Sequence, residues 1–470
     1  MNGIRKIALV LVFSFIFLTL GLVYWQVVQA DTMLDNPANR RAVFLEKRIT
    51  RGGIYDRNGV VLAETKETGS SKVRVYPQGE MFQPLLGYAT VQYGSAGLEA
   101  TEAENLLGLN DNSVLRKIQN TFELPRKGHD LILTLDSRLQ EVAYQKLRGQ
   151  AGAVVALNPQ NGDVLVLVSQ PSFDANRLEE DWEKIRQQEG SPLLNHAFSQ
   201  YPPGSIMKVV TSAALFQAGL DTTDLYNCEG STIINGQTIQ EQNDKAHGWV
   251  NYDLALAYSC NTYFAEHGIK AGLNSFIRAV SDFGFGKEIP FDLYVPVSSI
   301  TRDEAVPDNL NLNLFAASTF GQGQVMISPF HVALITAGIA NKGKIMTPHL
   351  IDRVLDSKQN IRYESKPEVW LTPLSEQEAE KVKSGMILAV TDGTASPGSL
   401  SGVQIAAKTG SAEPGGNRKT HAWYIAFAPA EEPVIAVAVL VEHGGTGGGA
   451  AAPIAKAVIE KALELKEGGD

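Results

Sequence analysis

The longest uninterrupted hydrophobic stretch of the chain lies near its N-terminus. Residues Ile7–Val28 carry no charged side chain, and an α-helix needs about 20 such residues to cross the hydrocarbon core of a membrane. Tyr24 and Trp25 stand near the far end of the stretch, where aromatic side chains meet the lipid headgroups. We favour an uncleaved membrane anchor over a cleaved signal peptide ending at Ala30, because the hydrophobic region of a signal peptide has only about 7–15 residues.

Charges around the stretch give a weak indication of its orientation. Arg5 and Lys6 precede it, and Asp31 and Asp35 are the first charges beyond it. Five basic residues also follow the stretch: Arg40, Arg41, Lys47, Arg48 and Arg51. Long domains are translocated largely regardless of charge. We therefore expect a single-pass protein of the cell membrane, with a cytoplasmic N-terminus and an extracytoplasmic catalytic domain.

Between the hydrophobic stretch and Leu131 the hydrophobic pattern is broken and polar. Two apolar runs flank Asn58-Gly59 within Arg51–Thr65, which predicts a β-hairpin. Residues Glu99–Gln119 have a weak helical pattern of leucines. This part is too short for a second large domain. We expect an anchor over residues 1–28 and a small membrane-proximal pedestal over residues 29–130.

From Leu131 onward the pattern predicts strands at both ends and helices between them. The sequence gives one short helix, SRLQEVAYQKL, before two strands, a long helical region over Pro202–Thr391, and a final helix over Ala451–Lys466. The expected strands are Gly152–Pro159, Gly162–Gln170, Val403–Gly410, His421–Pro429 and Pro433–Glu442. Early and late strands in one chain predict a single α+β domain over residues 131–470, whose antiparallel sheet joins the two ends.

Composition narrows the class of protein. The 470 residues are 44% hydrophobic and 20% charged, which is typical of a folded chain. With 41 basic against 51 acidic residues, the formal net charge is -10. Phosphates repel a chain of this charge, so we expect no nucleic-acid partner.

The cysteines and histidines offer no recognisable metal motif. Two cysteines, Cys228 and Cys260, exclude a disulfide-rich scaffold and a cysteine-rich zinc module. A disulfide between them is one alternative, and two buried thiols are the favoured one. Four histidines show no paired ligand spacing, and we expect them to be structural or solvent-facing: His247, His331, His349 and His421.

The most informative helix is predicted to begin near Ser205 and end near Gly219. It is apolar on nearly every side except for a stripe formed by Ser205, Lys208 and Ser212, at positions i, i+3 and i+7. Burial lowers the pKa of a lysine, and a neutral amine beside a hydroxyl activates serine as a nucleophile. By itself, however, Ser-x-x-Lys is more typical of a lysine that reaches from a core helix to water.

Two further motifs follow the helix in the chain. These are Ser259-Cys260-Asn261, and Lys408-Thr409-Gly410 at the first of the late strands. Ser-x-x-Lys, Ser-x-Asn and Lys-Thr-Gly in this order are the signature of serine enzymes that recognise penicillin. Lys383-Ser384-Gly385 is a decoy for the third motif, because it lies in a predicted helix rather than on a strand.

On these motifs the chain resembles the monofunctional (class B) penicillin-binding proteins, and most closely the short-pedestal group of penicillin-binding protein A. The resemblance extends over nearly the whole chain, through RGGIYDRNG, YPPGSIMK, SCN, AKTGSAE and HAWYIAFAP. It implies a penicillin-binding transpeptidase domain of the serine β-lactamase type, with an antiparallel sheet flanked by helices. It also implies a D,D-transpeptidase that cross-links peptidoglycan stem peptides, binds β-lactams covalently and needs no metal or organic cofactor.

The resemblance assigns catalytic roles to five residues. Ser205 attacks the carbonyl of a D-Ala-D-Ala stem peptide and becomes acylated, and Lys208 takes its proton. Ser259, with Asn261 and Lys408 nearby, relays a proton to the departing amine.

The same resemblance assigns substrate binding to the third motif. Thr409, Gly410 and Ser411 are the expected substrate-binding residues, and Thr409 and Ser411 hold the substrate carboxylate. The backbone N–H groups of Ser205 and Ser411 form an oxyanion hole.

Two glycine-containing segments are less specific. Gly321-Gln322-Gly323 is similar to a loop near the family's active site, but a simple turn explains it at least as well. Gly444–Gly449 lacks the Lys-Ser/Thr of a phosphate-binding loop, so we expect a flexible turn.

Two other classes of function remain open. A D,D-carboxypeptidase or a β-lactamase uses the same motifs with water as the acceptor. A non-catalytic β-lactam sensor or scaffold is the second class, and the three intact motifs count against it. The expected partners are stem peptides that donate D-Ala-D-Ala or an amine, β-lactams, the membrane and other wall-synthesis proteins.

Overall fold

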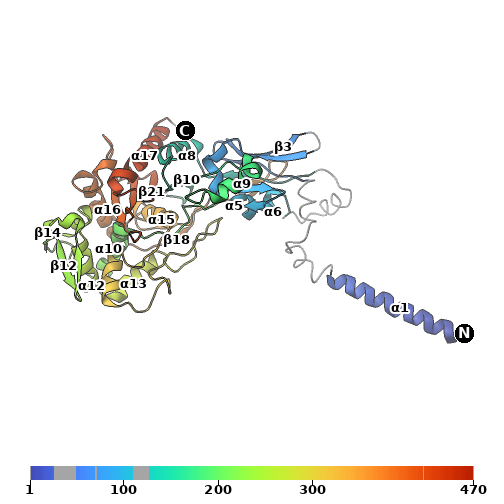
Figure 1. The fold of residues 1–470 in the computed structure, drawn as a ribbon, viewed down its shortest axis with the longest axis horizontal. Coiled ribbons are helices and arrows are strands. Elements are labelled where there is room, and N and C mark those ends of the chain that lie inside the picture. Colours follow the sequence, from blue (N-terminus) through green and yellow to red (C-terminus); the bar gives the residue numbers. More distant parts are fainter. Residues whose placement is uncertain (1, 26–48, 69–70, 110–125, 417, 469–470) are drawn as a thin grey trace.

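The structure is a computed structural model that describes residues 2–25, 49–68, 71–109, 126–416 and 418–468. Helix α1 (Asn2–Val23) projects away from the rest of the protein, with no part of its apolar span covered (Figure 1). The span Gly3–Val23 is long and apolar enough to cross a membrane. The alternative cleavage position at Ala30 lies outside the described residues.

A five-stranded antiparallel sheet forms the centre of the larger part of the molecule, in the order β10-β9-β21-β20-β19. Its strands are β9 (Gly152–Leu157), β10 (Val164–Gln170), β19 (Ala406–Ala412), β20 (His421–Ala428) and β21 (Ile435–Val441). The early strand β9 pairs with the last strand β21. The prediction that two early and three late strands form one sheet is confirmed.

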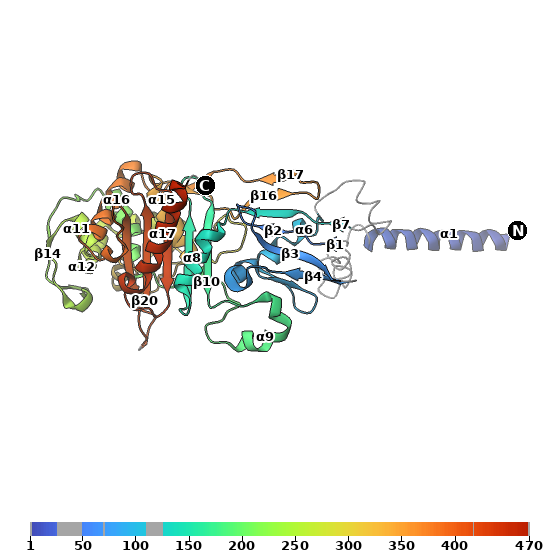
Figure 2. The same cartoon turned by 90° about the horizontal axis from the view of Figure 1, so that it is seen from above.

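Both faces of this sheet are covered by helices. Val154 and Ala156 point into a core shared with α8 (Ser137–Leu147) and α17 (Ala452–Glu467), which lie together along one face (Figures 1 and 2). The alternate residues of β9 point into the larger core that includes α15 (Pro329–Ala340). Strands buried on both faces read as continuous hydrophobic runs, which made them recognisable in the sequence.

The region that we expected to be helical contains most of the helices but also short strands. Its helices are η4 (Gly204–Ile206), α10 (Met207–Gln217), α11 (Tyr252–Ala257), α12 (Asn261–Ala271), α13 (Leu273–Asp282), α14 (Leu312–Thr319), α15 and α16 (Glu376–Thr391). Its strands are β11 (Tyr226–Cys228), β12 (Ser231–Ile234), β13 (Gln237–Gln240), β14 (Gly248–Val250), β15 (Ile345–Met346), β16 (Ile351–Leu355), β17 (Ile361–Glu364) and β18 (Val369–Leu371). The expectation of a helical region over Pro202–Thr391 was therefore incomplete. Strands of two to five residues are too short to show a hydrophobic period in the sequence.

The part nearer α1 is built on a six-stranded sheet, in the order β17-β16-β8-β2-β3-β4 (Figure 2). Its other strands are β2 (Ile54–Tyr55), β3 (Val61–Thr68), β4 (Ser71–Val75) and β8 (Asp130–Leu133). Strands β2 and β3 form the hairpin predicted around Asn58-Gly59, and Gly59 supplies the positive φ of the turn. Strands β16 and β17 come from beyond residue 350, so distant segments of the chain share this sheet.

Short elements complete this part of the molecule. They are β1 (Ile49–Thr50), η2 (Gly79–Phe82), α4 (Gln83–Leu86), β5 (Tyr88–Thr90), β6 (Gly94–Ala96), α5 (Gly97–Thr101), α6 (Ala103–Leu106), β7 (Arg126–Lys127), η3 (Ala175–Arg177) and α9 (Leu178–Gln187). The helix expected over Glu99–Gln119 corresponds to α5 and α6, and residues 110–119 lie outside the described residues.

Candidate active site

Ser205 lies in a tight turn that leads into α10. Gly204 adopts a φ of 56°, which is readily accessible only to glycine. A side chain on Gly204 would approach within 2.7 Å of the Ser411 carbonyl oxygen. The glycine therefore lets the start of the helix press against β19, and so brings Ser205 beside the third motif.

A hydrogen-bonded network holds the segment before Ser205. The Trp423 indole N–H on β20 donates to the Pro202 carbonyl at 3.0 Å. The Glu442 carboxylate lies 2.6 Å from both the Tyr201 hydroxyl and His196 Nδ1. Burial and the Glu442 charge raise the pKa of Tyr201, so its hydroxyl remains a donor. These bonds hold the segment against β20 and against the residue that follows β21.

Lys208 lies beneath Ser205 and is fully buried. Its Nζ is 3.1 Å from Ser205 Oγ, 3.2 Å from Ser259 Oγ and 2.7 Å from Asn261 Oδ1. Burial lowers the pKa of Lys208 to about 8, although nearby acidic groups oppose the shift. A neutral amine is thus within reach near neutral pH, at hydrogen-bond distance from the hydroxyl it would deprotonate.

Ser259 joins Lys208 to a second lysine. Its φ of 62° is unusual for a residue with a side chain, and such conformations concentrate at functional sites. Lys408 Nζ, also fully buried, lies 2.9 Å from Ser259 Oγ. Burial, and then the charge of Lys208, lower the pKa of Lys408. One hydroxyl therefore contacts two lysines whose charged forms are both disfavoured.

The third motif lies on β19, the edge strand of the five-stranded sheet, as the motif requires. Thr409 and Ser411 line a cleft of about 710 Å³. Gly410 faces away from it, since a side chain there would meet Trp423 Cβ at 3.0 Å. The decoy Lys383-Ser384-Gly385 lies within α16, as expected from its sequence context.

Most of the site residues predicted from the sequence line the cleft. Those lining it are Ser205, Ser259, Asn261, Thr409 and Ser411. Lys208 and Lys408 lie beneath them, connected through the hydrogen bonds described above. All three motifs therefore meet in one place, although Lys208 of the first motif and Lys408 of the last are far apart in the sequence.

Both glycine-containing segments border the cleft. Gln322 lines it, and the Gly321 carbonyl accepts a hydrogen bond from the Gly204 N–H at 3.0 Å. The segment expected to be a flexible turn instead ends in a helical turn, η7 (Gly447–Ala451). Only glycine fits at position 447, since a side chain would collide with the Trp423 carbonyl. Close packing explains Gly447, whereas Gly445 has open space around it and adopts a φ of 85°, which favours glycine.

Glu241 is a residue of the site that the sequence did not reveal. Its carboxylate accepts the backbone N–H groups of Asn261 at 2.9 Å and Thr262 at 2.8 Å. It thereby satisfies the free donors at the start of α12. Glu241 follows a short hairpin and precedes a polar loop, so its neighbours in the sequence gave no signal of this role.

Comparison with known proteins agrees with this geometry. A family model described as the penicillin binding protein transpeptidase domain matches residues 152–460, and one described as the penicillin binding protein A dimerisation domain matches residues 51–129. The chain is 33% identical to the peptidoglycan D,D-transpeptidase PbpA of Mycolicibacterium smegmatis, covering 98% of this chain and 99% of that protein. The PbpA of Mycobacterium tuberculosis gives the same identity and coverage.

Solved structures show the same similarity. Penicillin-binding protein A from M. tuberculosis, in its ceftriaxone acyl-enzyme complex, has a TM-score of 0.83 and 32% identity, covering 89% of this chain and 100% of that chain. Its penicillin G acyl-enzyme complex has a TM-score of 0.81 and 32% identity, covering 88% and 99%. The similarity therefore includes structures in which a β-lactam has acylated the protein.

Proposed function

The chain belongs to the class B penicillin-binding proteins and is a peptidoglycan D,D-transpeptidase of the penicillin-binding protein A group, and on this premise we propose which of its residues perform the reaction. Ser205 is the nucleophile that the D-Ala-D-Ala donor peptide and β-lactams acylate. Lys208 is its general base. The observation that carries the assignment is the position of Lys208 Nζ, buried and 3.1 Å from Ser205 Oγ.

In the acylation step, Ser205 Oγ attacks the carbonyl carbon of the donor peptide as neutral Lys208 accepts the hydroxyl proton. The amide bond breaks, and D-alanine leaves with a proton delivered through Ser259. Asn261 holds Lys208 through its side-chain oxygen, 2.7 Å from Nζ. An amine of a second stem peptide then attacks the ester, which forms the new amide bond and releases Ser205.

We assign substrate binding to β19, the edge strand of the five-stranded sheet. Thr409 and Ser411 face the cleft and bind the substrate carboxylate, while Lys408 beneath them donates a hydrogen bond to the Thr409 carbonyl at 2.8 Å. Gly410 contributes close packing rather than a side chain. The N–H groups of Ser205 and Ser411 are the donors assigned to the developing oxyanion.

A mass measurement tests the nucleophile. The full chain in detergent is incubated with benzylpenicillin, and intact mass is recorded for wild type, Ser205→Ala and Ser212→Ala. We expect one stable adduct on wild type and on Ser212→Ala, a matched control on the same helix, and none on Ser205→Ala. An adduct on folded Ser205→Ala would reject Ser205 as the nucleophile, and rapid turnover of the wild-type adduct would favour hydrolysis.

We also propose the division into an anchor (1–28), a pedestal (29–130) and a transpeptidase domain (131–470), with the anchor's N-terminus in the cytoplasm. Arg5 and Lys6 at the start of α1 support this orientation. Protease added to intact spheroplasts should digest an epitope at the C-terminus and spare one at the N-terminus. The opposite pattern would reverse the topology.

The pedestal is the surface that we propose for other wall-synthesis proteins. Its strand β4 is an edge of the six-stranded sheet, and edge strands offer backbone groups for pairing with another chain. Proline substitution within β4 should weaken cross-linking to such partners in cells and leave penicillin acylation unchanged. Loss of both would indicate a folding defect instead.

A further inference from the structure

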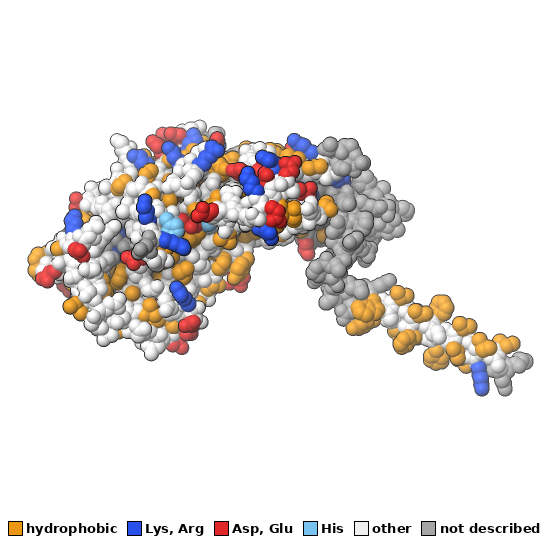
Figure 3. Space-filling model, in the orientation of Figure 1, with side chains coloured by type: hydrophobic (Ala, Val, Ile, Leu, Met, Phe, Trp, Pro, Cys, Tyr) orange, Lys and Arg blue, Asp and Glu red, His pale blue; other side chains and the backbone are white. Residues whose placement is uncertain are grey.

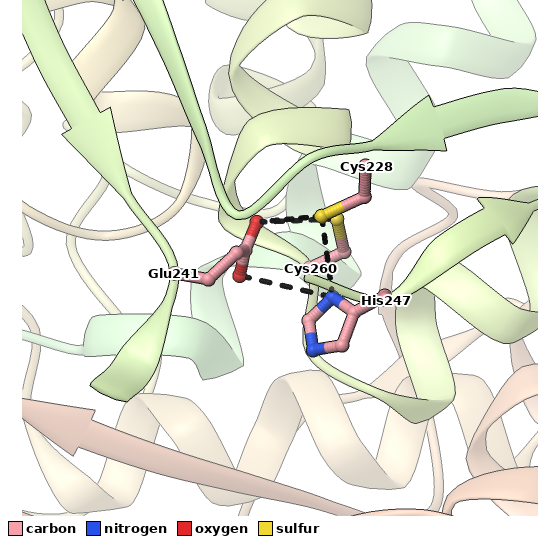
Figure 4. A group of neighbouring side chains, drawn as sticks. All are labelled: Cys228, Glu241, His247 and Cys260. Atoms are coloured by element: carbon pink, nitrogen blue, oxygen red, sulfur yellow. Dashed lines mark hydrogen bonds and ion pairs between the residues drawn. The ribbon is translucent and has the colours of Figure 1, made fainter. Parts of the chain in front are cut away.

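Four side chains with metal-binding chemistry converge directly behind the second motif. They are Cys228, Glu241, His247 and Cys260 (Figure 4). One ligand atom from each lies within 4.8 Å of every other. Cys228 ends β11, Glu241 follows β13, His247 precedes β14 and Cys260 precedes α12. Four separate segments thus direct sulfur, oxygen and nitrogen atoms to one point.

The separations between these atoms are close to those around a single tetrahedral ion, and every pair lies within 4.8 Å. Cys228 Sγ lies 3.6 Å from His247 Nδ1 and 3.7 Å from Glu241 Oε1. Cys260 Sγ lies 3.2 Å from Glu241 Oε1, and His247 Nδ1 lies 3.9 Å from Glu241 Oε2. Zinc bonds of about 2.0–2.3 Å at tetrahedral angles place neighbouring ligand atoms about 3.3–3.8 Å apart.

The chemical types of the four ligand atoms indicate which metal ion the site would bind. Two sulfurs and one imidazole disfavour magnesium and calcium, which take oxygen ligands, and suit Zn²⁺. Cys228, Cys260 and Glu241 are buried, whereas the His247 side chain is 12% exposed; His247 and Glu241 both line the catalytic cleft. An ion can therefore enter from the cleft past His247, while the other three ligands are shielded from solvent.

We propose that Cys228, Glu241, His247 and Cys260 form a four-coordinate Zn²⁺ site that positions the second catalytic motif. Binding replaces the two thiol protons by the metal, so two protons are released for each ion bound. The proposal gives His247 a metal-binding role in place of the structural or solvent-facing one expected from sequence. Its partners Cys228, Glu241 and Cys260 follow no recognised metal-ligand spacing, which explains why the sequence gave no signal.

The position of the site gives it a consequence for catalysis. Cys260 is the middle residue of Ser259-Cys260-Asn261, and Glu241 binds the Asn261 N–H. A metal bonded to both would fix the backbone that places Ser259 Oγ and Asn261 Oδ1 against Lys208. The four ligands are positioning residues, because they act through Ser259 and Asn261, whose side chains contact Lys208.

The first test is the metal content of the full chain, purified in detergent without a polyhistidine tag or chelator. We expect about one zinc per chain by elemental mass spectrometry. Cobalt substituted for zinc should give the charge-transfer absorption of thiolate ligands. A metal-free protein with two free thiols, or one lighter by two hydrogens because of a disulfide, would overturn the proposal.

Variants locate the ion. His247→Ala and, separately, Cys228→Ser should each lower the affinity for zinc by at least about 100-fold in competition with a chelator. His267→Ala is the matched control, because His267 lies in the same part of the fold but stacks on Tyr263, outside the cluster. Wild-type affinity in both ligand variants would place the zinc elsewhere and overturn the proposal.

The positioning role rests on the proposed function, and its readout is separate from metal content. Removing zinc, or substituting His247, should slow penicillin acylation by up to about 100-fold, the scale of a small misplacement of catalytic groups. Zinc should restore the rate of the stripped wild type and fail to restore His247→Ala. A stripped protein that is acylated at the wild-type rate would overturn the positioning role, whereas absence of acylation in every form would count against the proposed nucleophile instead.

Discussion

The chemistry of the site depends on two lysines that contact one hydroxyl. Lys208 and Lys408 reach Ser259 Oγ at 3.2 Å and 2.9 Å, and both are fully buried. Burial disfavours each charge, and Lys208 further lowers the pKa of Lys408. Groups this close titrate as a pair. In the proposed mechanism, loss of a proton from the pair converts the buried ammonium group of Lys208 into the base for Ser205.

Lys208→Arg tests this view of the base. A guanidinium group stays charged and cannot accept the Ser205 proton, so we expect acylation to fall by about 10²–10⁴-fold. The pKa of Lys208 is lowered to about 8, so the Lys208 amine is mostly neutral only when the pH is above this value. The wild-type rate should therefore rise with pH through about 8 and then level off, as followed with a fluorescent penicillin.

Lys383→Arg is the control for this substitution. Lys383 belongs to the decoy motif on α16 and pairs with Glu380 at 2.7 Å. Its variant should keep both the rate and the pH profile of wild type. A wild-type rate independent of pH across this range, with folding unchanged, would contradict neutral Lys208 as the base.

At the scale of elements, what the sequence could predict depended on burial. Strands β9 and β21, buried on both faces, appear as hydrophobic runs and were predicted. Strand β17 is exposed along its whole length, so nothing in its pattern indicated that it joins a distant sheet. The order of the motifs predicted residues that the structure brings together at one cleft, but Glu241 and His247 enter the site only because a hairpin folds back against α12.

The contact between the Gly321 loop and the start of α10 controls the geometry of the nucleophile. A side chain at Gly321 would collide with the Gly204 carbonyl. We expect Gly321→Ala to separate the loop from Ser205, slow acylation by about 100-fold and destabilise the protein by more than about 3 kcal/mol. Acylation kinetics and denaturant unfolding measure the two effects.

Gly402→Ala is matched to this variant in backbone conformation. Gly402 has a φ of 78° against 79° for Gly321, but a side chain there meets nothing within 4 Å. It should cost only about 1–3 kcal/mol of backbone strain and leave the acylation rate unchanged. Equal effects of the two substitutions would show that strain, not the collision, is responsible.

At the scale of the whole molecule, α1 stands apart from the folded remainder. Hydrophobic side chains lie along the length of α1 on the face that Figure 3 shows, and Phe17 is 80% exposed. A monomeric soluble protein rarely exposes an apolar surface of this extent. The helix must be covered by lipid, detergent or another protein, whereas the active site is built from segments beyond residue 200.

Removing residues 1–28 tests whether the apolar helix affects only the association of the protein with membranes or also the activity of the distant site. Because no part of the apolar span is covered by the rest of the protein, the shortened chain should remain in the supernatant without detergent and unfold with unchanged cooperativity. Its second-order rate constant for penicillin acylation should stay within about twofold of the full chain in micelles, since the catalytic contacts lie far from the anchor. Sedimentation and acylation kinetics on the same preparation give both quantities. A shortened chain that is soluble but acylated more than about tenfold more slowly would mean that the anchor acts on the catalytic geometry and not only on location.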